Sequence, residues 1–315
     1  MTLMKALAVT LRASECAGRI SSYYGVSYTC VMVGSNKRKY SRITIQYSPY
    51  NVSLLHQCYL GVYVPEFQSD GIFNEQDYIR YNQNWTEPLS TFTICTRSMM
   101  YFLRGAKQHF FSYANTQSDD ALNGAIKVDP KDNSFKLIIC KFRPLECVKH
   151  ELGEDFFFNQ WMHMCAVFTA TNSSNPDVFD SKIELYINGS RIAETTQALD
   201  KDQFKTVEGG GVLIIGQEQD SIGGYFDDTQ SWSGSVTQLE IWSKAISLDD
   251  IQKLASCEIE TLDIPERIVQ WTENQWTAFG NVSLKQESLG TFCQTPPRLN
   301  SVLQFLSYII HTYSI

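Results

Sequence analysis

Four acidic residues lie close together in the stretch GQEQDSIGGYFDDTQSWSG, residues 216–234. Glu218 and Asp220 precede a Gly-Gly pair, and Asp227 and Asp228 follow it. Two uncompensated carboxylates about 4 Å apart repel each other by roughly 1 to 4 kcal/mol, depending on the local dielectric. Carboxylate and amide oxygens are the ligands that calcium prefers, and glycines let the backbone turn tightly between them. The stretch is therefore either a calcium-binding loop or a solvated acidic hairpin.

Acidic pairs also serve enzymes, because glycosidases place two carboxylates on either side of the bond that they cleave. The pattern E-x-D-x-x-E, which a laminarinase-like glycosidase would carry on one strand, does not occur in this chain. The EF-hand pattern D-x-D-x-D-G-x5-E is absent as well. We therefore expect a binding protein without catalytic residues.

Composition indicates a folded chain from an oxidising, secretory compartment. Of 315 residues, 43% are hydrophobic and 13% aromatic, which is enough for a sizeable core. The net charge of −8 argues against a nucleic-acid partner. Nine cysteines occur without a C-x-x-C pair, which disfavours a zinc ribbon or a redox motif. Five N-x-[ST] sequons beside these cysteines favour a secreted or extracellular protein. The sequons are at Asn51, Asn84, Asn172, Asn188 and Asn281.

Neither end of the sequence predicts a membrane span. The N-terminal apolar stretch ALAVTL stops at Arg12, short of the usual core of about 7–15 residues in a signal peptide. The C-terminal stretch SVLQFLSYIIHTYSI contains Gln304 and His311 and falls short of the roughly 20 residues that cross a bilayer. We therefore interpret both ends as incomplete or atypical, with an apolar tail over residues 296–315.

Short apolar runs alternate with turn sequences from about residue 90 onward. These runs are rich in β-branched and aromatic residues, and several alternate with period two, which predicts strands. The predicted strands are 91–97, 108–114, 134–140, 161–170, 182–189, 212–216 and 235–242. The intervening sequences NSSNPD, EGGG and KDN are typical of turns. Many strands with almost no helix between them predict an all-β antiparallel sandwich.

One helix interrupts the strands. The stretch ISLDDIQKLAS, residues 246–256, offers Ser247 as an N-cap and places Ile251 and Leu254 on one face, which predicts a short helix packed on a sheet. Residues 1–66 contain strand-like pieces such as RITIQY, but their structure is unclear from the sequence. Residues 258–295 suggest a small disulfide-closed appendage, because Trp271 and Trp276 lie between two cysteines.

The acidic loop and its flanks resemble the pentraxins, the family of C-reactive protein and serum amyloid P component. VLIIGQEQDSIGGYFDDTQSWSGSVTQLEIW followed by SLDDI is similar to that family's order of strand, calcium loop, strand ending in Trp, and short helix. The stretch FSYANTQSDDA, residues 111–121, resembles the earlier segment that donates further ligands. His163 and Cys165 match two positions of the family signature H-x-C-x-[ST]-W-x-[ST]. The resemblance implies a lectin-like jelly-roll sandwich over residues 67–257.

The resemblance also implies two calcium ions that bind the ligand directly. On the family pattern the ligands are Asp119, Asp120, Glu218, the backbone oxygen of Gln219, Asp220, Asp227 and Gln230. The implied partner is an anionic small molecule, a phospholipid headgroup or a glycan. Phosphocholine-binding members carry an apolar side chain, often Phe, where this chain has Ala125 or Ile126, so we expect no choline pocket.

The cysteines suggest three disulfides. The resemblance pairs Cys95 with Cys165 and implies a staple of two strands across the core. Cys140 and Cys147 would close a short hairpin, and Cys257 and Cys293 would close the appendage. Three cysteines then remain, so that one is free or intermolecular. They are Cys16, Cys30 and Cys58. We interpret His163 as a buried strand residue with a backbone partner, in preference to a metal ligand or a catalytic group.

These features favour a secreted, calcium-dependent, lectin-like protein of innate pattern recognition, which is often a homo-oligomer in the family. The alternative is an adhesion module of a larger receptor or matrix protein. The Cys-Trp-Trp-Cys arrangement of residues 257–293 resembles the pentraxin-like domains of adhesion-type G-protein-coupled receptors. Sequence that continues beyond Ile315 into further domains would favour this alternative.

Overall fold

The computed structural model describes residues 27–33, 40–46, 61–103, 107–129, 134–143, 145–153, 158–258 and 264–292. The chain divides into two compact units, Met1–Gly61 and Val62–Ile315. In the first unit, β1 (Ser27–Val33) and β2 (Tyr40–Gln46) pair as an antiparallel hairpin. β2 contains most of the RITIQY stretch that looked strand-like in the sequence.

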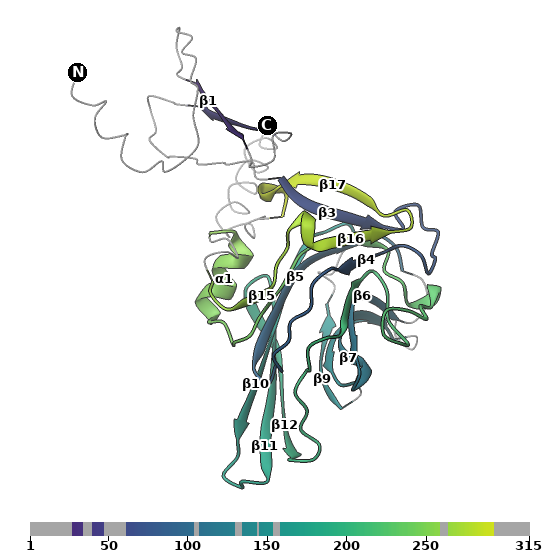
Figure 1. Cartoon of the computed structure of the whole chain (residues 1–315), viewed down its shortest axis with the longest axis vertical. Coiled ribbons are helices and arrows are strands. Elements are labelled where there is room, and N and C mark those ends of the chain that lie inside the picture. The colour runs from purple at the N-terminus through teal and green to yellow at the C-terminus, as the bar shows by residue number, and fades with distance from the viewer. Residues whose placement is uncertain are drawn as a thin grey trace, which may run out of the picture. The chain divides into compact units, whose positions relative to one another are not determined.

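The second unit is a sandwich of two antiparallel sheets, which confirms the predicted fold class (Figure 1). The larger sheet has the order β12-β11-β10-β5-β14-β3-β17, with β15 beside β14. Its strands are β3 (Gly61–Phe67), β5 (Phe92–Met100), β10 (Met162–Asn172), β11 (Val178–Ile187), β12 (Ser190–Asp200), β14 (Gly234–Trp242), β15 (Arg267–Val269) and β17 (Ser283–Ser288).

The smaller sheet has the order β16-β4-β13-β6-β7-β8-β9. Its strands are β4 (Tyr78–Tyr81), β6 (Lys107–Asn115), β7 (Ser118–Val128), β8 (Phe135–Lys141), β9 (Glu146–Leu152), β13 (Val212–Ile215) and β16 (Trp276–Phe279). Neighbouring strands of both sheets pair in antiparallel register, for example β6 with β7 and β7 with β8.

The core lies between the sheets and follows the two-residue alternation of the strands. On β5, Phe92 and Ile94 belong to the main buried cluster, and the ring of Phe92 stacks on that of Phe168 in β10 at 4.3 Å. Cys95, the residue after Ile94, belongs to a second cluster on the other face of the same sheet. Because successive strand residues point to opposite faces, one sequence supplies both layers of packing.

Helix α1 (Leu248–Ser256) covers the outer face of the larger sheet (Figure 1). As predicted, Ser247 caps its N-terminus, accepting a hydrogen bond from the backbone N–H of Asp250 at 3.1 Å. The predicted face is also correct, because Ile251 and Leu254 are buried in the cluster that contains Cys95. Among the described residues, no helix combines the length and hydropathy needed to cross a bilayer.

The disulfide between Cys95 and Cys165 does not cross the core. These cysteines lie directly opposite each other on β5 and β10, neighbouring strands of the larger sheet, and face α1. The expectation of a staple across the core is therefore wrong, because each cysteine alternates with core residues and points outward. A second disulfide joins Cys140 to Cys147, again on adjacent strands, β8 and β9.

The remaining cysteines fall largely outside the described residues. Cys257 is disulfide-bonded, but its predicted partner, Cys293, lies outside them. The same holds for Cys16, for Cys58 and for the side chain of Cys30.

Residues 264–292 complete the two sheets. The sequence suggested a separate appendage over residues 258–295, whereas β15, β16 and β17 add strands to both sheets of the sandwich. Trp276 packs against Trp271 at 4.9 Å and against Tyr81 of β4 at 5.0 Å, so both tryptophans serve the sandwich itself. The expected apolar tail, residues 296–315, lies outside the described residues.

Arg97 connects the larger sheet to the structures that cover it. Its side chain is only 4% exposed and donates hydrogen bonds to Leu254 O at 2.6 Å, Phe292 O at 3.3 Å and Gln238 Oε1 at 2.8 Å. Burial lowers the pKa of Arg97 to about 10. The guanidinium of Arg97 on β5 thus binds both the C-terminal end of α1 and the backbone of Phe292.

We expect Arg97→Met to lower the free energy of unfolding by about 3 kcal/mol, because it leaves several buried acceptors without a donor. Chemical denaturation of the variant and the wild type measures this difference. Arg191→Met is the matched control, since Arg191 is an exposed arginine on β12 and forms only surface ion pairs. Equal losses in the two variants would contradict the structural role of Arg97.

Candidate metal centre

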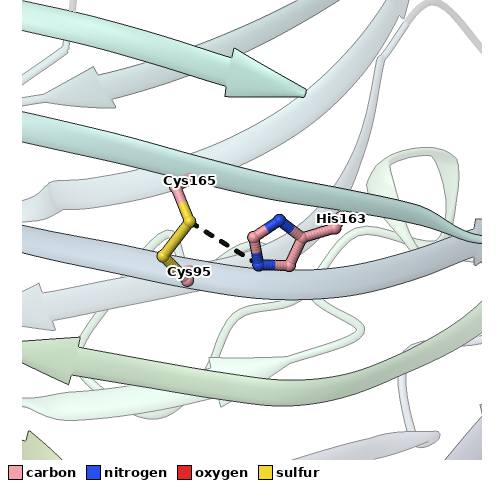
Figure 2. A group of neighbouring side chains, drawn as sticks. All are labelled: Cys95, His163 and Cys165. Atoms are coloured by element: carbon pink, nitrogen blue, oxygen red, sulfur yellow. Dashed lines mark hydrogen bonds between the residues drawn. A yellow bond between two sulfur atoms is a disulfide. The ribbon is translucent and has the colours of Figure 1, made fainter. Parts of the chain in front are cut away.

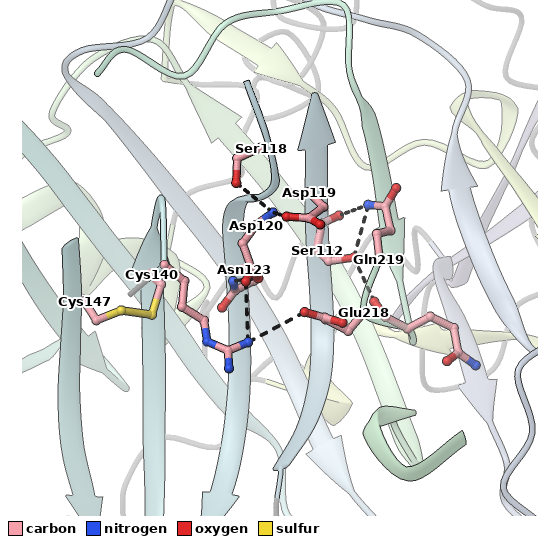
Figure 3. A network of polar contacts seen from close by, with 11 residues as sticks. Ser112, Ser118, Asp119, Asp120, Asn123, Cys140, Cys147, Glu218 and Gln219 are labelled. Atoms are coloured by element: carbon pink, nitrogen blue, oxygen red, sulfur yellow. Dashed lines mark hydrogen bonds and ion pairs between the residues drawn. A yellow bond between two sulfur atoms is a disulfide. The ribbon is translucent and has the colours of Figure 1, made fainter. Parts of the chain in front are cut away.

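The pairing of β13 with β6 brings two distant segments together. Val212 is opposite Ala114 and Ile215 is opposite Phe111, and β6 then turns into β7 at Ser118. The acidic loop begins immediately after β13, level with Phe111 in the middle of β6, and folds back along the two strands, since Gln219 contacts Ser112 and Val212. Figure 3 shows Asp119 and Asp120 on β7 and Glu218 on the loop in the same region of the sheet, and the charge of Asp120 acts on Glu218.

Gln219 fixes the start of the loop through its side chain. Its Nε2 donates to Ser112 O at 3.1 Å and to Val212 O at 3.0 Å, and its Oε1 accepts from the backbone N–H of Gly223 at 2.8 Å (Figure 3). Gly223 has a φ of 77°, a conformation that favours glycine. Because the side chain is committed to these bonds, the atom that Gln219 can offer to a metal is its backbone oxygen.

Glu218 is a buried carboxylate in an acidic environment. Its exposed fraction is 4%, and its Oε2 has no hydrogen-bond partner among the described residues. Burial raises the pKa of Glu218 to about 8, and the negative charges of Asp120 and Asp220 add to the rise. A buried carboxylate with an unpartnered oxygen beside two further acids fits a cation, and this donor set of oxygens suits calcium.

The β6–β7 turn positions its aspartates with local hydrogen bonds. The backbone N–H of Asp120 donates to Ser118 Oγ at 3.1 Å and to Asp119 Oδ1 at 3.0 Å. Asp120 Oδ1 accepts from Asn123 Nδ2 at 2.6 Å. Asp119 is exposed and Asp120 is half-buried. The start of β7 therefore presents one exposed carboxylate, that of Asp119, and one half-buried carboxylate anchored by Asn123, that of Asp120.

The far end of the acidic loop closes in the short 3₁₀ turn Asp228–Gln230. Asp227 caps this turn, because its Oδ1 accepts from the backbone N–H and from the hydroxyl of Thr229, both at 2.8 Å. The structure thus groups Asp120, Glu218 and Asp220 electrostatically, whereas Asp227 and Gln230 lie at the other end of the same loop.

The tightest group of potential metal ligands among the described residues lies elsewhere. Ligand atoms of Cys95, His163 and Cys165 fall within 4.8 Å of one another (Figure 2), whereas the described carboxylates do not form such a group. Both sulfur atoms belong to a disulfide and so are not thiolates, the form that binds metals. This group is therefore not a metal centre.

His163 is buried, but its ring does not have the expected backbone partner. Its Nε2 lies 3.7 Å from Cys165 Sγ, and its Nδ1 has no hydrogen-bond partner among the described residues (Figure 2). Burial lowers the pKa of His163 well below its usual value, and the charge of Arg97 adds to this, so the ring is neutral. The prediction of a backbone-satisfied histidine is wrong in this respect.

Two cations near the acidic loop were not found from the sequence. Arg143 Nη1 lies 3.5 Å from Asp120 Oδ2 and 3.7 Å from Glu218 Oε1. Lys107, at the start of β6, is partly buried, and burial lowers its pKa to about 8, with the charge of Arg143 adding to the effect. Neither residue belongs to a recognisable motif, and only the folded arrangement places them here.

The described sequons are all accessible. Asn84, Asn172, Asn188 and Asn281 are exposed, which a glycosylation acceptor requires. Asn51 lies outside the described residues.

Comparison with known proteins identifies the family of this chain. The profile of the Pentaxin family matches residues 72–286, more than half of the chain. Human neuronal pentraxin-2 is 32% identical over 124 residues, which cover 39% of this chain and 26% of the relative. C-reactive protein 1.1 of Limulus polyphemus is 24% identical over 202 residues, covering 64% of this chain and 76% of the relative. The chain thus spans about a quarter of the length of the neuronal pentraxin that it matches.

A solved structure shares the fold. The native heptameric SAP-like pentraxin from Limulus polyphemus superimposes with a TM-score of 0.58 at 22% identity, over 74% of this chain and 98% of that one. The residues that the family profile matches, 72–286, lie within the second unit. The chain therefore belongs to the Pentaxin family, the pentraxins.

Proposed function

We propose that this chain is an extracellular domain that binds anionic groups through two calcium ions. The ligands come from the β6–β7 turn and from the loop after β13. They are Asp119, Asp120, Glu218, the backbone oxygen of Gln219, Asp220, Asp227 and Gln230. The observation that carries the proposal is the buried carboxylate of Glu218, whose Oε2 is unpartnered and whose neighbours Asp120 and Asp220 are also acidic.

The chemistry of binding follows from the donor set. Bound calcium supplies positive charge and coordination positions that a phosphate, carboxylate or acidic saccharide group fills. The chain's own residues hold the oxygens in place. Gln219 secures the loop to β6 and β13, and Asn123 secures Asp120. This binding requires no catalysis, so no catalytic residue is proposed.

An extracellular location is supported by the covalent chemistry of the chain. Two disulfides lie on adjacent strands, and four sequons are exposed. Both features suit an oxidising, secretory compartment. The proposed partners are therefore phospholipid headgroups or glycans with acidic groups, as displayed on cell surfaces. An array of both, probed with calcium and with a chelator, identifies the class.

A second candidate is an adhesion or ligand-binding module of a larger protein. This is favoured by the relatives, because the match covers only 26% of human neuronal pentraxin-2 and 41% of the Xenopus laevis pentraxin fusion protein. A free recognition protein gains avidity by assembling copies of itself, whereas a module gains it from its parent chain. A closed homo-oligomer in sedimentation experiments supports the first candidate, and a monomer supports the second.

We expect Asp220→Ala to weaken calcium binding at least tenfold and to abolish calcium-dependent retention on the array. Asp220 is exposed at the loop, so the sheets and disulfides stay intact and the melting temperature of the metal-free protein stays unchanged. Calorimetric calcium titration measures the loss. Asp228→Ala is the matched control, since it removes the same charge from the same loop without removing a proposed ligand. Equal losses in both variants would show a nonspecific charge effect.

Calcium is expected to order residues 216–231, because the carboxylates repel one another without a cation. Tyr225 is 82% exposed in this loop and offers a chymotrypsin site. Cleavage after Tyr225 should slow at least tenfold when calcium is added. Cleavage after Phe102, which is exposed outside the loop, provides an internal control and should not change. Unchanged cleavage at Tyr225 would count against the site.

A further inference from the structure

Arg143 faces both the acidic group and the solvent. Its Nη1 contacts Asp120 Oδ2 at 3.5 Å and Glu218 Oε1 at 3.7 Å, while its side chain remains 39% exposed. Its backbone N–H also donates to Asp120 O at 3.3 Å. The guanidinium therefore stands at the accessible border of the candidate calcium site, within reach of a molecule that approaches from solution.

The turn that carries Arg143 is held from several sides. It joins β8 to β9, and the disulfide between Cys140 and Cys147 closes the two strands just before and after it. Phe142 has a φ of 50° and donates its backbone N–H to Ala121 O of β7 at 3.1 Å. The position of Arg143 is thus set by β7, β8 and β9, and not by a free loop.

Lys107 supplies a second cation next to Arg143. In the register of β6 and β7, Lys107 is opposite Lys127 and His109 is opposite Ala125. Because alternate residues share a face, these four residues lie on one face of the sheet. Asn123 lies on the same face of β7 as Lys127 and donates to Asp120 at 2.6 Å, so this face leads from Lys107 to the candidate site. The charges of Arg143, Asp120 and Glu218 on Lys107 agree with this placement.

The charges around these two cations would repel a positively charged ligand. Apart from the carboxylates already assigned to calcium, the groups that act on Lys107 are the cations Arg143 and Lys127. Buried His109 is also influenced by Lys107 and Arg143, and it stays neutral because its pKa is held well below its usual value. Ala125 provides no aromatic face that could attract a quaternary ammonium.

We propose that Arg143 and Lys107 form an anion subsite beside the calcium site, so that the domain selects ligands with a second negative group close to the calcium-bound one. This inference rests on the proposed function. Without calcium, Arg143 pairs with Asp120 and Glu218. When those carboxylates bind calcium they no longer need a guanidinium, and Arg143 is then available to the ligand.

Two probes of similar size test the subsite by calorimetry in excess calcium, using the full chain. 2-Phosphoglycolate and phosphoethanolamine both carry a phosphate ester, but the other end is a carboxylate in the first and an ammonium in the second. We expect the wild type to bind 2-phosphoglycolate about tenfold more tightly, as charge-assisted hydrogen bonds predict. Arg143→Gln and Lys107→Gln should each weaken it several-fold and leave phosphoethanolamine binding equal or tighter.

A matched control and a second readout separate this role from damage to the fold. Lys149→Gln removes an exposed lysine of β9 that does not influence Lys107, so both affinities should stay unchanged. Titration with calcium alone should show Arg143→Gln binding the metal a few-fold more tightly, since a competing cation is removed. A disturbed turn would instead weaken calcium and 2-phosphoglycolate together.

Three results would overturn the inference. Equal affinity of the wild type for the two probes, or a preference that persists in both variants, refutes the subsite and leaves the calcium-dependent function standing. In that case Asp220→Ala still abolishes binding of both probes. If neither probe binds the wild type in calcium, the proposed function fails and the subsite fails with it.

Discussion

The register between β13 and β6 is the constraint on which the candidate site depends. Leu213 is opposite Tyr113 and Ile215 is opposite Phe111, and all four side chains are buried in the core between the sheets. A slip of one residue would turn this apolar set toward the outside, so the core specifies the register strongly. The same register decides where the chain leaves β13, and hence where the loop that carries Glu218 folds back toward Asp120 of β7.

Electrostatic strain is concentrated at that meeting point. A carboxylate as buried as that of Glu218 is costly to ionise beside other acids, and the charges of Lys107 and Arg143 offset this cost only in part. The free energy that this buried charge costs is offset by stabilising interactions elsewhere, in the apolar core and around Arg97 on the opposite sheet. A local electrostatic repulsion that the rest of a stable fold tolerates is typical of a site that binds an ion.

The sequence predicted those parts of the fold whose signals are local. The predicted strands 91–97 and 212–216 have alternating or uniformly apolar residues, and Ser247 is a recognisable N-cap for α1. These two strands and the helix appear in the structure within a few residues of their predicted bounds. β7 escaped notice because SDDALNGAIKV is rich in residues that disfavour strands. It forms because β6 and β8 pair with it on both sides. Gly124 is also required there, since a Cβ would lie 2.4 Å from the ring of Phe111.

The residues of the candidate site likewise fall into those with a local sequence signal and those without one. The acidic loop was visible because its donors are contiguous, and Asp119 and Asp120 were placed only by resemblance to a family. Arg143 and Lys107 could not be found from the sequence because one lies in the β8–β9 turn and the other on β6, and only the folded sheet brings them to the same region. Alternation alone would have shown that Cys95, next to the inward-facing Ile94, points away from the core.

The bond between Cys95 and Cys165 has a bearing on how the domain matures. It ties neighbours within one layer, and the bond between Cys140 and Cys147 does the same in the other layer, so neither of these two disulfides links the layers. Oxidation of this pair needs only the β5–β10 ribbon and can precede docking of the second sheet. A nascent chain can therefore pass through a form in which the disulfide is already made but the aromatic core residues are still exposed. Docking of the second sheet then buries these residues and completes the fold.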